Sequence, residues 1–194
     1  MTMIHDSAEV HPDAIIGEGT SVWHLVQVRE NPVIGENCTI GRAAYIGPGV
    51  MLGRNCKVQN LALIYDPAAI GDGVFIGPGA ILTNDVYPRA VDQTGELKSA
   101  DGWESVGVTI GDGASIGARA VIRAGVSIGA WALVGAGAVV VSDVPAHAMV
   151  LGNPARQRGW VGRAGKRLQP DGDELICPTT GVRHRLVDGE LVEG

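Results

Sequence analysis

The chain has 194 residues, of which 29 are Gly; 45% are hydrophobic and only 4% are aromatic. This length and composition suit one domain with room for an appendage, and a core built from small and branched aliphatic side chains. The net charge of −6 argues against nucleic-acid binding, because nucleic-acid-binding surfaces are basic. No apolar stretch approaches the length of a membrane span, so we expect no membrane association of that kind.

The N-terminal segment MTMIHDSAEVHPDA has neither the basic nor the apolar region of a secretory signal. The three cysteines, Cys38, Cys56 and Cys177, are too few for a disulfide framework. Both features predict a cytoplasmic protein.

Aliphatic residues recur at every sixth position along most of the chain. Fourteen fall between residues 4 and 82, six more fall between 110 and 140, and eleven of the twenty are followed directly by Gly. The series is Ile4, Val10, Ile16, Val22, Val28, Ile34, Ile40, Ile46, Leu52, Val58, Ile64, Ile70, Ile76, Leu82, Ile110, Ile116, Ile122, Ile128, Val134 and Val140.

A period of six fits neither an α-helix nor a run of simple amphipathic strands, but it fits short strands joined by tight corners. The aliphatic residue would point inward, and the residue after it would take a corner conformation that Gly adopts without steric penalty. Three such sides make one coil, and coils stack at the strand spacing of about 4.8 Å. The sequence therefore predicts an all-β parallel helix of about 6–7 coils. Cys38 and Cys56, which are three hexads apart, should be stacked in its core.

The phase of the repeat breaks between Leu82 and Ile110, whose separation is not a multiple of six. We expect a loop excursion over residues 83–108, and a loop of this length is usually functional. The helix should cover residues 1–145. Residues 146–194 should form an exit segment and a β-hairpin tail, with turns at Thr180-Gly181 and Asp188-Gly189.

Over residues 4–160 the chain resembles the hexapeptide-repeat acyltransferases. The resemblance is carried by the [LIV]-G-x4 hexads, by the protruding loop, and by an ending that runs from Asp143-Val144-Pro145 to Gly152-Asn153-Pro154-Ala155-Arg156. It implies a left-handed β-helix, a homotrimer, and acyl-CoA bound between neighbouring subunits. Handedness follows from the resemblance alone, because parallel crossovers are otherwise right-handed.

Five short motifs are similar to those of sugar-nucleotide N-acetyltransferases that acetylate a 3-amino group. They are Trp23-His24, Gln59-Asn60, Tyr65-Asp66, Thr83-Asn84-Asp85 and Tyr87-Pro88-Arg89. This similarity implies acetyl-CoA as the donor and a UDP- or dTDP-linked amino sugar as the acceptor, with the loop lying over the sugar nucleotide.

The resemblance gives Asn84 the task of accepting a hydrogen bond from the sugar amine and aiming it at the thioester. A structural interpretation, in which Asn84 caps the turn into the loop, stays open. His24 is the rival catalytic residue, since His is the usual general base at neutral pH. It could equally be a hydrogen-bonded surface residue.

Candidate binding residues fall into two groups. Asn60, Tyr65, Asp85 and Arg89 are candidates for the sugar nucleotide, because carboxylates suit hydroxyl groups and Arg suits anions. The cofactor candidates are Arg156 and Arg158 for the phosphates of acetyl-CoA, and Gly135 and Ala136 for its pantetheine arm. Solvated charges and ordinary corner residues would explain the same positions.

We expect no metal, because Thr180 stands where a zinc ribbon pairing with Cys177 would need a second Cys. A carbonic anhydrase built on the same prism is disfavoured, since no His lies between residues 25 and 146. A non-enzymatic scaffold would leave the long loop unexplained. The remaining alternative is an acetyltransferase for a small molecule without a nucleotide, such as serine, a free sugar or an antibiotic.

Overall fold

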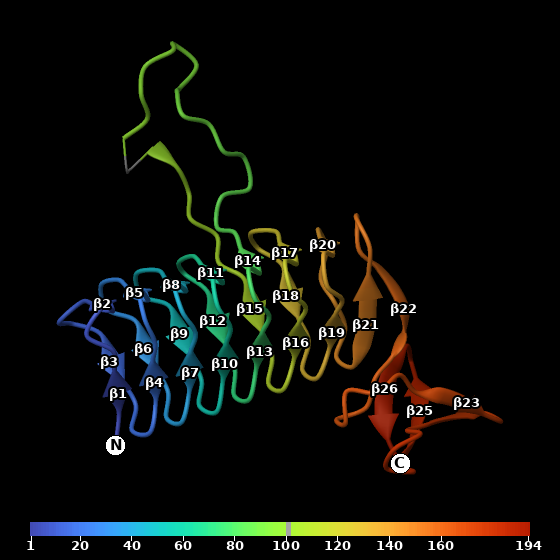
Figure 1. Ribbon diagram of the computed structural model, residues 1–194. Coiled ribbons are helices and arrows are strands. Elements are labelled where there is room, and N and C mark those ends of the chain that lie inside the picture. The colour runs from blue at the N-terminus through green and yellow to red at the C-terminus, as the bar shows by residue number, and fades with distance from the viewer. Residues whose placement is uncertain (100–101) are drawn as a thin grey trace.

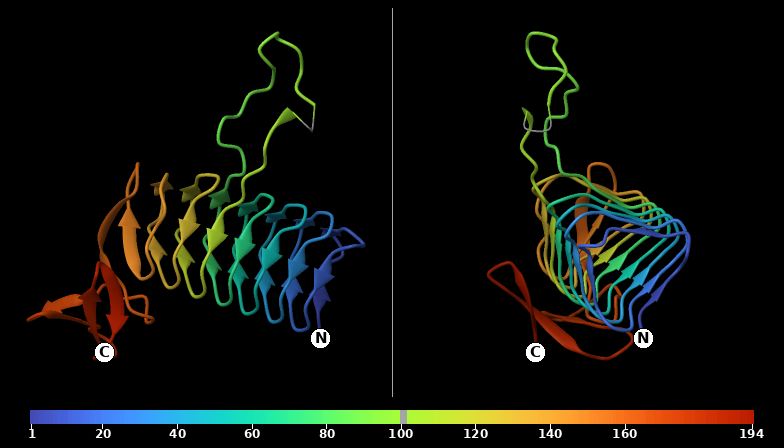
Figure 2. Two further views of the ribbon diagram at one scale, coloured as in Figure 1. Left: turned by 180° about the vertical axis from the view of Figure 1, so that it is seen from behind. Right: turned by 90° about the vertical axis from the view of Figure 1, so that its left-hand side faces the viewer.

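The computed structural model describes residues 1–99 and 102–194. Figure 1 shows an elongated stack of short parallel strands, a long loop standing off its side, and a small sheet at the C-terminal end. Viewed along its axis, the stack is a three-sided prism (Figure 2). The described residues form no helix, and so none that could cross a membrane. The expected left-handed parallel β-helix is confirmed.

Three sheets form the sides of the prism. Sheet A contains β1 (Met3–Ile4), β4 (Ser21–Val22), β7 (Thr39–Ile40), β10 (Lys57–Val58), β13 (Phe75–Ile76), β16 (Ser115–Ile116), β19 (Leu133–Val134), β21 (Ala148–Leu151) and the antiparallel β22 (Arg156–Trp160). Sheet B contains β2 (Glu9–Val10), β5 (Gln27–Val28), β8 (Tyr45–Ile46), β11 (Leu63–Ile64), β14 (Ile81–Leu82), β17 (Val121–Ile122) and β20 (Val139–Val140). Sheet C contains β3 (Ile15–Ile16), β6 (Val33–Ile34), β9 (Met51–Leu52), β12 (Ala69–Ile70), β15 (Thr109–Ile110) and β18 (Ser127–Ile128).

Each two-residue strand places its first side chain outside the prism and its second inside. Val58, for example, pairs in register with Ile40 and Ile76 and is completely buried. The predicted cysteine stack is also present, since the backbone N–H of Cys56 donates to Cys38 Sγ at 3.4 Å. From Val10 to Val140 the hexad series therefore forms one continuous aliphatic core along the axis, whereas Ile4 in the first coil is 46% exposed.

The glycines that follow the inward residues serve a different purpose from the one predicted. The left-handed backbone conformation falls two residues later, at positions such as Asn37 (φ 56°) and Gly49 (φ 63°). Gly35 is required instead by close approach, because a Cβ there would lie 2.6 Å from the backbone N of Arg54 in the next coil. The spacing of stacked coils, rather than the corner dihedral, selects Gly at this position.

The prism continues past residue 145. Strand β21 pairs in parallel with β19 in sheet A, with Leu133 opposite Met149. The sequence separation of these two residues is shorter than the three hexads of a regular coil. Sheet A consequently has eight parallel strands, where about 6–7 coils were expected. The shortened last coil explains why the period of six does not reveal it.

The C-terminal residues form an antiparallel sheet of four strands. They are β23 (Gln169–Asp171), β24 (Glu174–Ile176), β25 (Arg183–Val187) and β26 (Glu190–Glu193). The two predicted hairpins correspond to the β24–β25 and β25–β26 pairs, and β23 was not predicted. This sheet contacts the last coil, where the rings of His147 and His184 lie 6.3 Å apart.

Two edges of the prism carry the candidate residues. We call the edge after each sheet A strand the AB corner and the edge after each sheet B strand the BC corner. Residues three hexads apart in uninterrupted coils lie at the same corner, one strand spacing apart.

Candidate active site

The long loop leaves the prism at the BC corner after β14 and returns at β15. In sheet C, Ala69 pairs with Met51 on one side and with Thr109 on the other, so the insertion is longer than a whole regular coil. The loop stands well clear of the prism (Figure 1), and its outer part folds back through a bridge between Val91 and Leu97. The predicted excursion over residues 83–108 corresponds to this segment.

Asn84 lies half-buried where the loop begins. Its Nδ2 is 3.4 Å from Ser105 Oγ, on the returning arm of the loop. Ser105 in turn donates its hydroxyl proton to the backbone oxygen of Asp66 at 2.8 Å. The backbone N–H of Val106 donates to the backbone oxygen of Asn84 at 2.9 Å, which closes the loop at its root.

Asp66 and Ser105 were not predicted as site residues. The period alone could have indicated Asp66, because it precedes Asn84 by three hexads and so lies beneath it at the BC corner. Nothing in the repeat indicates Ser105, because it lies inside the insertion.

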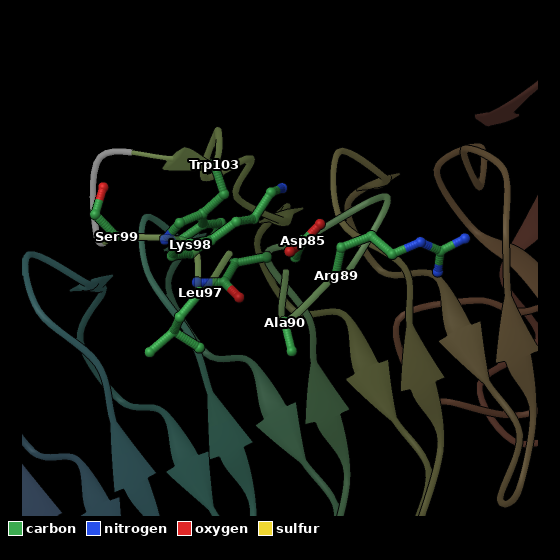
Figure 3. Close-up of a pocket in the computed structure, with 8 residues that line it drawn as sticks. Asp85, Arg89, Ala90, Leu97, Lys98, Ser99 and Trp103 are labelled. Atoms are coloured by element: carbon green, nitrogen blue, oxygen red, sulfur yellow. The ribbon is translucent and has the colours of Figure 1, made fainter. Parts of the chain in front are cut away.

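A pocket of about 440 Å³ opens against this root. Figure 3 shows its lining, with Trp103 and Lys98 close together on one side and the guanidinium of Arg89 extending away from them. The predicted Asn84, Asp85 and Arg89 are thereby brought to one pocket, while Lys98 and Trp103 were not predicted. The lining consists of Asn84, Asp85, Arg89, Ala90, Leu97, Lys98, Ser99 and Trp103.

The charges of this pocket suit a polar, anionic ligand. Arg89 and Lys98 supply two cations, and Asp85 supplies one carboxylate, which also accepts the backbone N–H of Tyr87 at 2.8 Å. Trp103 is 40% exposed and offers a flat apolar surface beside these charges. Such a combination can hold phosphates, hydroxyl groups and a planar ring at once.

Tyr65 lies one coil below the start of the loop, at the same BC corner as Asn84. Its backbone N–H donates to the backbone oxygen of Leu82, at the end of β14, at 3.3 Å, and its ring lies 5.2 Å from that of Tyr45. Burial raises the pKa of the Tyr45 hydroxyl above its ordinary value of 10.0. The two tyrosines therefore form an aromatic border on the coils before the loop.

His24 and Asn60 lie at the AB corner, away from Asn84. The ring of His24 is exposed and stacks on that of His5 with 3.5 Å between centroids. Three strand spacings, about 14 Å along the axis, separate its coil from that of Asn84. Asn60 is engaged in the prism, since its Oδ1 accepts the backbone N–H of Arg42 at 2.9 Å. Within one chain, neither residue joins the pocket at the loop.

Arg156 begins β22 opposite Leu151, at the C-terminal end of the prism. It lines a second pocket of about 450 Å³ together with residues 140–145 from the corner after β20. The corner after β20 lies two strand spacings, about 10 Å along the axis, beyond that of Asn84. Residues 141–145 of this pocket thus lie at the same edge of the prism as Asn84, and Arg156 borders the pocket from β22. Arg158 is exposed in β22 and does not line this pocket.

Gly135 and Ala136 follow β19 and therefore lie at the AB corner, beneath Leu151, the residue that pairs with Arg156. Ala136 is exposed, and a Cβ at Gly135 would collide with the side chain of Leu151.

The family model for the bacterial transferase hexapeptide (six repeats) matches residues 31–66 and 107–142 of this chain. These two ranges lie on either side of the loop and coincide with regular coils of the prism. Over these two ranges the chain is similar to the hexapeptide-repeat family.

Proteins similar to this chain include enzymes with a named activity. Over 87 residues it is 38% identical to dTDP-3-amino-3,6-dideoxy-alpha-D-galactopyranose 3-N-acetyltransferase from Aneurinibacillus thermoaerophilus, a match that covers 44% of this chain and 45% of that protein. It is also similar to a crystal structure of a perosamine N-acetyltransferase variant from Caulobacter crescentus, in complex with CoA and GDP-perosamine. That match has 28% identity and a TM-score of 0.51, and it covers 82% of this chain and 57% of the other.

A third similar structure is the acetyltransferase domain of PglB from Neisseria gonorrhoeae, with 27% identity and a TM-score of 0.50 over 81% of this chain and 58% of that one. The chain thus spans about half the length of the relatives it matches.

Proposed function

We propose that this chain is an acetyl-CoA-dependent N-acetyltransferase that acetylates the 3-amino group of a nucleotide-linked amino sugar. The observation that carries the proposal is the pocket at the loop root, where an amide side chain, Asn84, meets two cations and an aromatic ring. The named activities of the relatives, which act on dTDP- and GDP-linked amino sugars, support the same class of reaction.

The reaction needs positioning more than it needs a base. A sugar amine with a pKa of about 7.7–8.0, like an α-amino group, is partly neutral at pH 7 and already nucleophilic. Asn84 Oδ1 would accept a hydrogen bond from this amine and aim its lone pair at the thioester carbon. The nitrogen–carbon bond forms, the carbon–sulfur bond breaks, and the amine proton leaves with the CoA thiolate as a thiol. Backbone amides would stabilise the tetrahedral oxyanion.

The loop pocket would bind the sugar nucleotide. Arg89 and Lys98 would pair with the pyrophosphate or with a carboxylate on the sugar, and Asp85 would accept hydrogen bonds from sugar hydroxyls. Trp103 would pack against the flat face of the base or sugar. Tyr65 would border the sugar from the coil below.

Acetyl-CoA would lie along the BC corner, with its thioester near Asn84 and its phosphates near Arg156. The complexes of similar structures with CoA support this donor. This direction of binding is supported by the Arg156 cation, which lines a pocket whose residues 141–145 lie at the same edge as Asn84.

We further propose that the protein is a cytoplasmic homotrimer. Successive outward residues of sheet C, Ile15, Val33 and Met51, are 62%, 45% and 58% exposed and stack in register into one apolar stripe. Contiguous exposed apolar surface favours self-association. In a trimer, His24, Gly135 and Ala136 could face the loop of a neighbouring subunit, and the mass in solution measured by light scattering tests the trimer directly.

The function is tested by measuring thiol release from acetyl-CoA with a panel of acceptors and by determining the product masses. The panel holds UDP-, dTDP- and GDP-linked 3-amino and 4-amino sugars, a free amino sugar and serine. Turnover confined to a nucleotide-linked 3-amino sugar is expected. Turnover of serine or the free sugar would instead establish a nucleotide-free acceptor, and turnover of a 4-amino sugar alone would change the position of acetylation.

A further inference from the structure

Asx side chains at one position of the hexad tie neighbouring coils together. This position lies two residues after the inward aliphatic residue, where Asn60, Asp72 and Asp112 are found. Their Oδ1 atoms accept backbone N–H groups from the preceding coil at 2.9, 2.9 and 2.8 Å. An Asn or Asp here therefore serves the backbone of the prism where the preceding coil offers an N–H group; Asp66 stands at the same position opposite Pro48, which has none.

Asn84 occupies the same position, two residues after Leu82, but it does not make this bond. The corresponding donor would be the backbone N–H of Asp66, yet the side chain of Asn84 turns to Ser105 instead. No described residue donates a hydrogen bond to Asn84 Oδ1.

The proton of Ser105 determines which end of the amide faces it. A hydroxyl group has one proton to donate. Ser105 gives it to the backbone oxygen of Asp66 at 2.8 Å, which is nearer than the carboxylate oxygen of the same residue at 3.4 Å. Toward Asn84 the hydroxyl can then only accept. The amide must present its NH2 group to Ser105, and its carbonyl oxygen is directed elsewhere.

The returning arm of the loop holds Ser105 firmly in this place. Next to it, Val106 N–H bonds to the backbone oxygen of Asn84. Gly107 packs so tightly on the backbone of Pro67 that a Cβ would collide with the carbonyl oxygen. These contacts fix the position of Ser105 between the coil that contains Asp66 and the coil that contains Asn84.

We propose that Ser105 is a positioning residue that orients the amide of Asn84 so that Oδ1 receives the amine of the acceptor. This inference rests on the proposed function for its catalytic consequence, but its geometric part stands on the Asp66–Ser105–Asn84 chain alone. Ser105 touches neither substrate, and it acts only through Asn84.

Kinetics of four variants test the catalytic consequence: Ser105→Ala, Ser105→Thr, Asn84→Ala and the double variant Ser105→Ala/Asn84→Ala. Ser105→Ala is expected to lower kcat by about 10- to 100-fold with both KM values nearly unchanged, and Ser105→Thr should restore most of the rate. In the Asn84→Ala background, Ser105→Ala should have no further effect, because the residue through which it acts is gone. Equal losses in both backgrounds would overturn the proposal.

Crystal structures of the wild type and Ser105→Ala test the orientation without any activity. In the variant, Asn84 should rotate and accept the backbone N–H of Asp66, as Asn60 accepts that of Arg42. An unchanged Asn84 side chain in Ser105→Ala would overturn the positioning role. If the wild type acetylates no nucleotide-linked amine, the proposed function fails, and this comparison still decides the role of Ser105.

Discussion

Asn60 and Asn84 are the same residue type at the same position of the hexad, yet their side chains have different partners. Asn60 Oδ1 accepts the backbone N–H of Arg42 at 2.9 Å, whereas Asn84 presents Nδ2 to Ser105 at 3.4 Å. The insertion that follows Asn84 supplies Ser105, so the side chain of Asn84 bonds to this serine instead of to the backbone of the preceding coil.

This contrast predicts a separation of catalysis from stability. Asn84→Ala should lower kcat by about 100-fold, because the amine loses the group that aims it. Asn60→Ala should leave kcat largely unchanged and cost about 1 kcal/mol of unfolding free energy. Steady-state kinetics and chemical denaturation measure the two effects, and a large fall in kcat for Asn60→Ala would make Asn60 a substrate contact after all.

His24 provides the test of base catalysis. Its distance from Asn84 within the chain leads us to expect that His24→Ala lowers kcat by less than about 10-fold, below a typical general-base contribution. The pH dependence of kcat/KM should then follow the amine of the acceptor. A loss in His24→Ala greater than that in Asn84→Ala would assign the base to His24, contributed across a subunit interface.

The two arginines of β22 should differ in their effect on the donor. Arg156→Ala is expected to raise KM for acetyl-CoA by about 10-fold, a loss of about 1.4 kcal/mol, because Arg156 lines the pocket at the BC corner. Arg158→Ala, which removes an equal charge outside that pocket, is the matched control and should change KM little. Equal increases in the two variants would mean that only the general positive charge matters.

The C-terminal sheet should lose stability in acid. Hydrogen bonds from Arg183 at 2.9 Å and Arg185 at 2.7 Å lower the pKa of Glu174 below its ordinary value of 4.5. Because the pKa is lower in the folded state, the stabilisation is complete above the ordinary value and is lost as the pH falls through the folded value. Glu174→Gln should therefore lower the melting temperature at pH 7, and the difference from wild type should shrink below pH 4.5. A difference that does not depend on pH would contradict this origin.

Glycine at two positions of the hexad should respond differently to substitution. Gly35→Ala places a Cβ 2.6 Å from the backbone of the next coil and should cost about 1–3 kcal/mol. Gly49→Asn is the control, because Asn37 and Asn55 already adopt the same left-handed conformation, with φ values of 56° and 58°. It should change the unfolding free energy by less than about 0.5 kcal/mol. Urea denaturation of both variants measures the difference, and equal costs would contradict close approach as the reason for Gly35.

The six-residue period could have predicted more of the candidate site. His24 and Asn84 are not separated by a whole number of coils, so the repeat alone places them at different corners. The same reasoning places Asp66 directly beneath Asn84. The period cannot predict the positions of Ser105, Lys98 and Trp103, because the loop contains no repeat that fixes where its residues return to the prism.

The sequence by itself determined the prism, its core and the place of the insertion. Each inward aliphatic side chain packs against its equivalents three hexads away, so a local repeat specifies every contact of the core. Tertiary structure alone decided that the loop returns Ser105 to Asn84, and that β22, after a shortened last coil, brings Arg156 to the pocket lined by residues 140–145. These contacts join residues outside the period, and they depend on how single hydrogen bonds and backbone approaches close the chain at each point.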